Sequence, residues 1–390
     1  MLASGAVISQ PGVARVWEVL PEARVVGGAV RDMLAGRQVE DVDFAVPLSP
    51  DEVMARAKSV GVRSVPTGLA HGTVTLLVEG RGFEVTSLRR DIETDGRHAR
   101  VVFTDDWEED AARRDFTFNA MFCDRHGKIF DYFGGQADLA AGMVRFVGVA
   151  QTRIIEDYLR ILRFFRFFAR YGRGEADREA ITAISLERAG LLGLSCERVW
   201  SEIKKILQAP APLMAVELMR SCAVLDLILP GAVVARLGAL LAQNAPVDPL
   251  LRLAALTDED LAGRLRLSKA EAQMLASWRA PFLLRADAKD DELRRAVADC
   301  SKAALIGQSW LNSGEEMGGT DLRARLTALK TPVFPLSGRD LAGLGIKAGP
   351  RMGSILTLVR RWWWEGGCVA DQAACLAQAS RISEHSEEDK

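Results

Sequence analysis

The pattern of apolar and polar positions changes near residue 145. Before that point, short runs of β-branched and aromatic residues alternate with turn residues, which predicts β-strands at residues 24–26, 42–46, 73–78, 83–88 and 117–123. The tripeptide at residues 79–81, Glu-Gly-Arg, separates two of these runs and predicts a hairpin turn. Helical spacing between the runs predicts helices at residues 13–20, 30–35 and 50–60.

After residue 150 the spacing becomes helical almost throughout. It predicts helices at residues 154–171, 198–207, 212–229, 231–242 and 355–364. Pro212 suits the first turn of its helix, where its missing N–H would be unpaired anyway. By contrast, residues 89–113 are rich in charge and predict a mobile loop, and the polar residues 383–390 predict a frayed end. We therefore expect an α+β protein: a head with a small mixed sheet, followed by an elongated all-helical remainder.

Composition is that of a globular protein. The 390 residues are 48% hydrophobic and 26% charged, and at about 150 residues per domain they suggest two or three domains. No apolar run approaches the roughly 18 residues that cross a bilayer, and residues 1–10 carry no basic residue, so neither a membrane span nor a targeting peptide is expected. The six cysteines are scattered without a C-x-x-C pair, which favours a reducing cytoplasm. The net charge of -2 excludes a whole-chain basic footprint for nucleic acid but not a local one.

The first candidate site is a glycine turn. Residues 25–32, VVGGAVRD, predict a strand, a turn and the start of a helix. Gly27 and Gly28 allow the backbone to approach a ligand closely, and a helix N-terminus offers free N–H groups to a phosphate. Arg31, next to Asp32, can add a bidentate phosphate contact. Alone, such a turn is more often purely structural.

Two carboxylates follow on the next predicted strand. Residues two apart on a strand point to the same side, so Asp41 and Asp43 project together. Two carboxylates on one side form a hard oxygen site for Mg²⁺, and two such metal ions can clamp the attacking and leaving oxygens of a phosphoryl displacement. Glu84, on another predicted strand, is either a third ligand or an exposed strand residue. The alternative for the aspartates is a solvated acidic strand end.

Several motifs in order resemble those of one family. The segment 27–37, GGAVRDMLAGR, followed by Asp41-x-Asp43, resembles the opening signature of the class II tRNA nucleotidyltransferase and bacterial poly(A) polymerase family. The segment 113–120, RRDFTFNA, resembles the family's ribose-recognition motif, and residues 131–145 resemble the link between head and neck. Residues 193–200, GLSCERVW, resemble a neck motif, in which Ser195 is expected to cap a helix. The resemblance implies a DNA polymerase β-like nucleotidyltransferase head.

The segment 156–160, EDYLR, predicts how a base is read. On a helix, positions three apart share a face, so Asp157 and Arg160 would present an acceptor beside a donor. Cytosine and adenine both offer an amino donor next to a ring-nitrogen acceptor, whereas uracil and guanine present the reverse order. An unpaired buried group costs roughly 1–3 kcal/mol, or about 10- to 100-fold per mismatch. The resemblance assigns base selection to this motif; without it, a salt bridge on a solvated helix would be favoured.

Three other segments carry hypotheses. Arg160, Arg163, Arg166 and Arg170 form a basic stripe suited to a triphosphate or an RNA backbone, and the interleaved phenylalanines 164, 165, 167 and 168 are expected to fill the core on the opposite face. Residues 94–98 resemble a flexible family loop that helps the switch from C to A addition, but an ordinary surface loop fits equally. Residues 336–353 resemble a tail motif, with tRNA contact and helix packing equally favoured. At least one tryptophan of 362–364 should be half exposed.

The resemblance implies an enzyme that adds CCA to the 3′ end of tRNA from CTP and ATP without a template. Its parts would be a catalytic head at residues 1–142, a base-selecting neck at 143–212, a helical body at 213–300 and a tRNA-binding tail at 301–390. Asp41 and Asp43 would be catalytic and would hold two Mg²⁺ ions. No obligatory protein partner is expected. The nucleotide would contact residues of the turn, the ribose motif and the neck: Gly27, Gly28, Arg31, Asp32, Arg114, Asp115, Asn119, Asp157, Arg160, Arg163 and Arg166.

Three alternatives stay open. A poly(A) polymerase of the same family shares the head chemistry, although such enzymes tend to carry strongly basic extensions that a net charge of -2 disfavours. A partial enzyme that adds only CC or only A is poorly excluded by the sequence. An RNA-binding protein with an inactive head is disfavoured by the intact Asp41 and Asp43.

Overall fold

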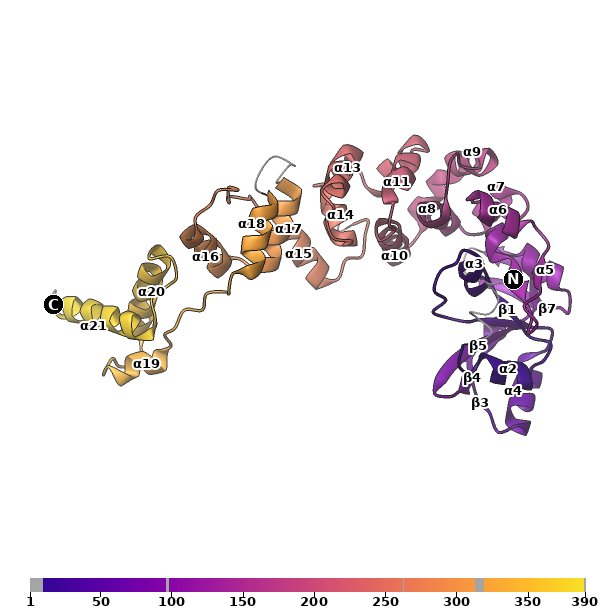
Figure 1. The fold of residues 1–390 in the computed structure, drawn as a ribbon, viewed down its shortest axis with the longest axis horizontal. Coiled ribbons are helices and arrows are strands. Elements are labelled where there is room, and N and C mark those ends of the chain that lie inside the picture. The colour runs from indigo at the N-terminus through magenta and orange to yellow at the C-terminus, as the bar shows by residue number, and fades with distance from the viewer. Residues whose placement is uncertain (1–9, 96–97, 262, 313–318, 389–390) are drawn as a thin grey trace. The chain divides into compact units, whose positions relative to one another are not determined.

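The computed structural model describes residues 10–95, 98–261, 263–312 and 319–388, and for 91–95, 98–101 and 385–388 the backbone alone. The chain divides into two compact units, whose helices and strands are drawn in Figure 1. Buried hydrophobic clusters lie within each unit. Unit 1 comprises Met1–Ala232 and Glu259–Arg266, and unit 2 comprises Val233–Asp258 and Leu267–Lys390. The expected α+β class is confirmed.

Unit 1 contains a mixed sheet of seven strands in the order β3-β4-β5-β2-β1-β8-β9. Neighbours are antiparallel except β2 and β5, which are parallel. The strands are β1 (Arg24–Val26), β2 (Phe44–Val46), β3 (Arg63–Gly68), β4 (Thr73–Val78), β5 (Arg81–Ser87), β8 (Met121–Cys123) and β9 (Ile129–Asp131). The predicted hairpin is confirmed, because Val78 pairs with Arg81 and both intervening residues, Glu79 and Gly80, have positive φ, as a type I′ turn requires.

Short helices accompany this sheet. They are α2 (Val13–Val19), α3 (Gly28–Leu34), α4 (Pro50–Ser59), α5 (Trp107–Ala112) and α6 (Gly135–Ala141), with 3₁₀ turns η1 (Leu69–His71) and η2 (Thr117–Asn119). α4 begins at a capping box formed by Ser49 and Glu52, and Pro50 occupies its first turn. The strand residues Val25, Phe44 and Val85 are at most 1% exposed, which places the core on the sheet.

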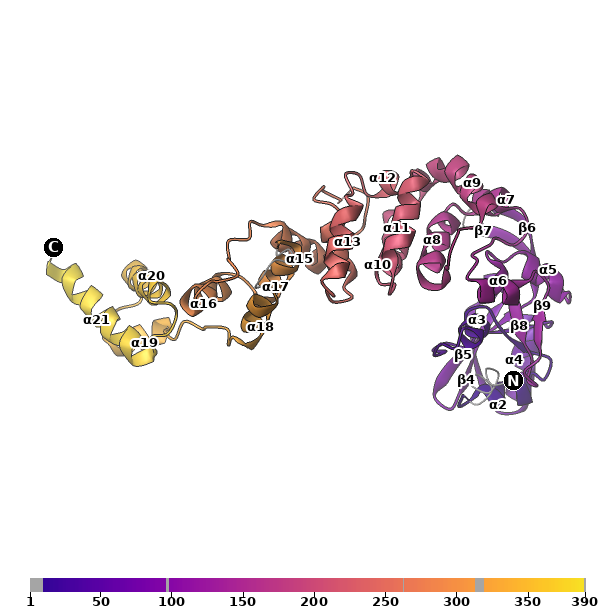
Figure 2. The same cartoon turned by 45° about the horizontal axis from the view of Figure 1, so that its top comes forward.

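The rest of unit 1 is helical: α7 (Ala150–Glu156), α8 (Leu159–Tyr171), α9 (Arg178–Glu187), η3 (Arg188–Gly193), α10 (Cys196–Leu207), α11 (Pro212–Ser221) and α12 (Leu225–Ile228). α8 packs against α10 and α11, which lie beside it in Figures 1 and 2. The four phenylalanines of α8 are buried, as predicted. Phe164 stacks on Phe146, 5.9 Å between ring centroids, and Phe146 contacts Phe116. These rings join α8 to the segment just before η2, which contains Phe116, and to the segment after α6, which contains Phe146.

Unit 2 is all-helical. Its helices are α13 (Val234–Ala242), α14 (Pro249–Leu256), α15 (Lys269–Arg279), α16 (Asp290–Asp299), α17 (Lys302–Asn312), α18 (Gly319–Ala328), α19 (Gly338–Gly343), α20 (Pro350–Glu365) and α21 (Gln372–Glu388). One buried cluster joins α16, α17 and α18, and another joins α19, α20 and α21 around Val359 and Trp363. Trp362 and Trp364 are 38% and 37% exposed, as expected for adjacent tryptophans. No helix of the described residues is long and apolar enough to cross a membrane.

Two predicted helices are broken. The helix expected at 154–171 is α7 and α8, separated by Asp157 in an extended conformation and Tyr158. Tyr158 packs against Gly190, where an added Cβ would lie 2.1 Å from its ring, so a distant contact fixes the break. The helix expected at 212–229 is α11 and α12, interrupted where Ala223 adopts φ 54°.

Other predicted boundaries were also wrong. The expected loop at 89–113 contains an antiparallel hairpin, β6 (Arg89–Asp95) and β7 (His98–Phe103), followed by α5. The valines of β7 pair with charged residues of β6, Val102 with Arg90 and Val101 with Asp91, so the charge of this segment did not prevent a hairpin. β2 starts at Phe44 rather than at residue 42, and the first half of the strand expected at 117–123 is η2. The end expected to fray at 383–390 continues α21 to Glu388.

Candidate active site

The glycine turn lies between β1 and α3, as predicted. Gly27 has φ 67°, a conformation that L side chains rarely adopt. An added Cβ there would lie 3.6 Å from Nη1 of Arg114, and at Gly28 it would lie 3.6 Å from Nη2 of Arg31. The glycines therefore let two guanidinium groups approach the backbone at the start of α3.

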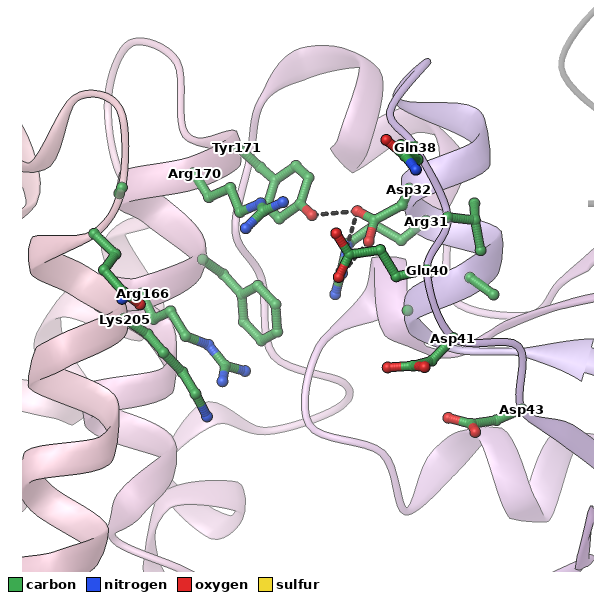
Figure 3. Close-up of a pocket in the computed structure, with 16 residues that line it drawn as sticks. Arg31, Asp32, Gln38, Glu40, Asp41, Asp43, Arg166, Arg170, Tyr171 and Lys205 are labelled. Atoms are coloured by element: carbon green, nitrogen blue, oxygen red, sulfur yellow. Dashed lines mark hydrogen bonds and ion pairs between the residues drawn. The ribbon is translucent and has the colours of Figure 1, made fainter. Parts of the chain in front are cut away.

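Asp41 and Asp43 lie immediately before β2. Both aspartates are exposed, whereas Val42 and Phe44 are buried, so the predicted alternation holds although the strand itself begins later. Figure 3 shows both carboxylates pointing into the same cavity. Although the Asp43 residue is exposed by surface area, its carboxyl group is partly desolvated by the surrounding protein, which raises its pKa; the nearby Glu84 and Asp41 raise it further, while Arg114 opposes them. Like charges are therefore concentrated beside Asp43.

The cavity that Asp41 and Asp43 line has a volume of about 380 Å³. It also contains Glu40 and Asp32, and we call it the acidic cavity. Its other wall is formed by residues of α8 and α10 and of the segment after α10: Arg166, Phe167, Arg170, Tyr171, Lys205, Gln208 and Ala209.

A second cavity of about 510 Å³ adjoins it, and we call it the arginine cavity. The two cavities share Gly28, Arg31, Asp43, Arg166 and Phe167. Most of the predicted nucleotide-binding residues line the arginine cavity: Gly27, Gly28, Arg31, Arg114, Asp115, Asn119, Asp157, Arg160, Arg163 and Arg166. Asp32 and Asp41 line only the acidic cavity, and Glu84 lines neither.

A chain of polar contacts connects the arginine cavity to α3. Asp115 accepts a hydrogen bond from Nε of Arg163 at 2.7 Å, and its other oxygen accepts one from Asn119 at 3.0 Å. Asn119 in turn accepts a hydrogen bond from Nη1 of Arg31 at 2.8 Å. Burial alone would raise the pKa of Asp115, but Arg163, the hydrogen bond from Asn119 and the charge of Arg160 together lower it below its usual value. Asp115 thus anchors a guanidinium of α8 to the ribose-motif segment.

The same series of polar contacts continues along the acidic cavity to Tyr171, at the other end of α8. Arg31 donates to Asp32 at 3.0 Å, and the Tyr171 hydroxyl donates to the same carboxylate. Because Arg163 and Tyr171 belong to one helix, these contacts close a ring, which we call the α8 ring: Arg163, Asp115, Asn119, Arg31, Asp32 and Tyr171. Phe167 lies between its ends, with the Arg31 guanidinium 5.0 Å from its ring centroid. This phenylalanine is buried as predicted but also lines both cavities.

The predicted Asp157–Arg160 pair is not a pair in this structure. Asp157 accepts hydrogen bonds from Nη2 of Arg198 at 2.7 Å and from the Leu159 N–H at 3.1 Å. Arg160 instead donates to Glu156 and to the Arg153 carbonyl. The expectation of one continuous helix face was wrong, because the helix is interrupted at Asp157. The Asp157 carboxylate instead caps the first N–H of α8, that of Leu159. Both side chains nevertheless line the arginine cavity, together with Arg198.

Two buried carboxylates were missed by the sequence reasoning. Asp110 is 1% exposed and binds Arg113 and Arg114, both at 2.8 Å. Glu202 on α10 is 4% exposed and binds Arg166 at 3.1 Å and Lys205 at 3.2 Å. The helical spacings from Asp110 to Arg113 and from Glu202 to Lys205 were visible, but burial was not. Each carboxylate holds a cavity-lining arginine in place.

Three other predictions have different outcomes. Ser195 is the N-cap residue of α10, but its side chain makes no capping hydrogen bond. The predicted loop at 94–98 is the end of the β6–β7 hairpin; Gly96 and Arg97 lie outside the described residues. The tail motif lies in unit 2, where Leu341 packs with α20 and α21, and a capping box joins Ser337 to Asp340.

Replacing Asp110 with Asn should destabilise unit 1 by about 3–5 kcal/mol at pH 7, because two guanidinium groups lose a buried counter-ion. Burial raises the pKa of Asp110, but Arg114 and Arg113 lower it to a value below 3.8. A carboxylate with a lowered pKa stabilises the fold above its unfolded pKa, and this stabilisation is lost as the pH falls through the folded pKa. The difference between wild type and variant in urea unfolding should therefore shrink at low pH. Glu108→Gln, an exposed change on the same helix, is the control; equal stabilities at pH 7 would contradict the prediction.

Comparison of the sequence with models of known protein families identifies the class of protein that these features resemble. Residues 23–145 match the family model of the poly A polymerase head domain, and residues 177–235 match the model described as the probable RNA and SrmB-binding site of polymerase A. The glycine turn, both aspartates and the ribose motif fall inside the first match. Unit 1 is therefore built on a polymerase-type nucleotidyltransferase head, as the resemblance predicted.

Relatives define the family more closely. The chain is 38% identical to the mitochondrial CCA tRNA nucleotidyltransferase 1 of Danio rerio over 359 residues, 88% of this chain and 83% of that protein. It is 30% identical to a CCA-adding enzyme of Lactobacillus gasseri over 93% of this chain and 94% of that protein. The crystal structure of the Bacillus stearothermophilus CCA-adding enzyme in complex with CTP has the same fold, with a TM-score of 0.73, 24% identity and coverage of 98% and 100%. The chain belongs to the CCA tRNA nucleotidyltransferase family.

Proposed function

We propose that this chain adds C, C and A to the 3′ end of tRNA, using CTP and ATP and releasing pyrophosphate. The observation that carries the proposal is the junction of the two cavities at Asp43: one cavity contains the catalytic candidates, and the other contains the base-reading candidates. Relatives named CCA tRNA nucleotidyltransferase support the substrates, as do solved complexes of CCA-adding enzymes of the same fold with CTP, ATP and tRNA.

The reaction joins the 3′-hydroxyl of the RNA to the α-phosphorus of the nucleotide and breaks the bond to pyrophosphate. Asp41 and Asp43 are the proposed Mg²⁺ ligands. Desolvation, followed by the charges of Glu84 and Asp41, raises the pKa of Asp43, and this crowding of carboxylates fits a divalent cation, because the cation would neutralise their charge. Bound there, Mg²⁺ would supply charge stabilisation and activate the attacking hydroxyl.

Two carboxylate ligands are compatible with Mg²⁺. Mg²⁺ is commonly held by one or two carboxylates together with substrate phosphates, so two aspartates are sufficient. We therefore assign both metal contacts to Asp41 and Asp43, and Glu84 acts on their charge from β5.

The nucleotide is proposed to lie in the arginine cavity. Gly27 and Gly28 give the triphosphate access to the backbone, and Arg31 supplies its charge, oriented by Asp32 and Asn119. Arg114 and Asp115 are the proposed ribose contacts, and both line this cavity. Arg163 and Arg166 add positive charge from α8.

Base selection is proposed for Asp157 and Arg160. In the free protein, Asp157 is paired with Arg198, and Arg160 with Glu156. A carboxylate has several acceptor sites and a guanidinium has five donors, so each side chain can bind a base edge while it keeps its protein partner. Those partners then fix the orientation of the two readers before the nucleotide arrives, which lowers the entropy cost of reading.

The division of labour along the chain is also a proposal. We assign catalysis to a head at residues 1–142, base selection to a neck at 143–212, support to a body at 213–300 and tRNA binding to a tail at 301–390. The cytoplasm is the proposed compartment because the six cysteines are all free thiols. The Danio rerio, Mus musculus and Homo sapiens relatives are named as mitochondrial enzymes, so fractionation of the source cells is the direct check.

One incubation series tests the function. Purified protein is mixed with Mg²⁺ and tRNA transcripts that end before CCA, after C or after CC, with CTP, ATP or both, and product 3′ ends are sequenced. Addition of CCA followed by arrest supports the proposal. Long A tails that are indifferent to CTP indicate a poly(A) polymerase, and products that stop at CC, or gain only the final A, indicate a partial enzyme. RNA binding without metal-dependent incorporation indicates an inactive head.

A further inference from the structure

The acidic cavity has a basic wall, and two of its residues, Arg170 and Lys205, have no role in the proposed nucleotide site. Arg166 and Arg170 of α8 and Lys205 of α10 lie across the cavity from Asp41 and Asp43 (Figure 3). Arg170 and Lys205 line the acidic cavity and not the arginine cavity. The base-reading candidates Asp157 and Arg160 line only the arginine cavity. The two cavities are therefore chemically different, although they share Asp43.

A buried carboxylate holds this basic wall together. One oxygen of Glu202 accepts from Nη1 of Arg166 at 3.1 Å and from Nζ of Lys205 at 3.2 Å. The Glu202 side chain is 5% exposed, that of Arg166 16% and that of Lys205 47%. About half of the Lys205 side chain is therefore accessible to a ligand, while its hydrogen bond to Glu202 fixes the position of the ammonium group.

Two polar atoms in this group have no partner among the described residues. The second oxygen of Glu202 and Nε of Arg166 are both buried and make no hydrogen bond. Unsatisfied buried polar atoms are rare and indicate a bound water or ligand nearby. Burial lowers the pKa of Arg166 to about 10, so it remains charged at neutral pH. Two cations over one buried anion leave one net positive charge, which matches one phosphodiester.

The chemistry of the reaction requires a second substrate on this side. The attacking and leaving oxygens of a phosphoryl transfer lie roughly in line, so the attacking RNA end and the leaving pyrophosphate lie on opposite sides of the phosphorus. If the nucleotide occupies the arginine cavity, the RNA end approaches from the acidic cavity. The only charged part of that RNA end is its phosphodiester backbone.

We propose that Lys205, with Arg166, contacts a phosphodiester of the RNA 3′ end that the proposed reaction brings to the acidic cavity. This inference rests on the proposed function and adds a specific RNA contact to it. Glu202 is a positioning residue, because it acts through Arg166 and Lys205. Asp157 and Arg160, the proposed base readers, do not line this cavity, so the proposed contact is made to the RNA backbone.

The test compares two neighbouring lysines of α10. Lys205→Ala should raise the KM for a CC-ending tRNA about five- to tenfold, the effect of one lost charge-assisted contact, with KM for ATP unchanged. The slope of log KM for tRNA against log salt should fall by about 0.7–0.9, the value for one phosphate contact, which a merely structural defect would not change. Lys205→Arg should retain the wild-type KM. Lys204→Ala is the control, because the Lys204 ammonium lies 5.6 Å from the centroid of the Trp200 ring and lines neither cavity.

The outcomes separate this inference from the proposed function. An unchanged KM for tRNA in Lys205→Ala, or an equal rise in KM for ATP, overturns the RNA site while CCA addition by wild type still stands. If wild type adds no nucleotide, the function fails, and fluorescence anisotropy with the same tRNA and no nucleotide decides the site by itself. There, a five- to tenfold weaker Kd for Lys205→Ala than for Lys204→Ala supports the site, and equal values overturn it.

Discussion

Asp43→Asn is expected to slow nucleotide incorporation at saturating substrates by about a thousandfold, because the proposed Mg²⁺ site loses one of its two carboxylate ligands. Asp41→Asn should have an effect of similar size. Glu84→Gln should cost far less, since Glu84 lines neither cavity and acts on Asp43 only through its charge. Single-turnover incorporation of ³²P-labelled AMP into CC-ending tRNA measures all three. Activity of Asp43→Asn within tenfold of wild type would remove Asp43 from the catalytic site.

The raised pKa of Asp43 predicts the direction in which Asp43→Asn changes the melting temperature, which provides a check that the variant is folded. Burial raises the pKa of Asp43, and Glu84 and Asp41 raise it further. A carboxylate whose pKa is raised contributes stability below its unfolded pKa of about 3.8, and this contribution is lost as pH rises through the folded pKa. With EDTA at pH 7.5, Asp43→Asn should therefore have a higher Tm than wild type, and the two values should converge near pH 3. Asp51→Asn, an exposed change on α4, is the control in both assays.

Asp157→Ala is expected to have the second largest effect, on fidelity rather than on the chemical step. The variant removes the acceptor for the amino group that C and A share, so kcat/KM for CTP should fall and the preference for CTP over UTP should fall by about 10- to 100-fold. Arg160→Ala should reduce the same preference through the ring nitrogen. Misincorporation is measured by sequencing product 3′ ends formed with each nucleotide alone.

A matched control variant distinguishes a specific loss of nucleotide preference from a general loss of activity. Glu175→Ala removes an acid whose salt bridge with Arg178 is largely exposed, at 87% and 93% of the two side chains, and should leave the CTP-to-UTP preference unchanged. If Asp157→Ala lowered incorporation of all four nucleotides equally, Asp157 would be a structural cap of α8 and not a reader, a role that its hydrogen bond to the Leu159 N–H already allows.

The sequence predicted the elements of the head well where local chemistry decides them. The glycine turn, the alternation around Asp41 and Asp43, and the type I′ hairpin at Glu79 and Gly80 depend on a few adjacent residues, and all are present. The break between α7 and α8 was not predictable in this way. It depends on Tyr158 packing against Gly190, a contact across 32 positions that leaves no periodic signal.

The candidate site was predicted as a set of residues but not as an arrangement. Pattern reasoning identified residues that line both cavities, yet it paired Asp157 with Arg160, whereas the structure pairs them with Arg198 and Glu156. It also missed Glu202 and Asp110, because nothing in a sequence distinguishes a buried carboxylate on an amphipathic helix from an exposed one. Which salt bridges form, and which acid is desolvated, depends on tertiary packing.

The α8 ring gives each cavity a hydrogen-bonded side chain from the same helix. Arg163 and Tyr171 are eight residues apart, or about 12 Å along α8, and Phe167 lies midway between them. Arg163 lines the arginine cavity, Tyr171 lines the acidic cavity, and Phe167 lines both. One helix therefore sets the spacing between the nucleotide-binding candidates and the wall that faces Asp41 and Asp43.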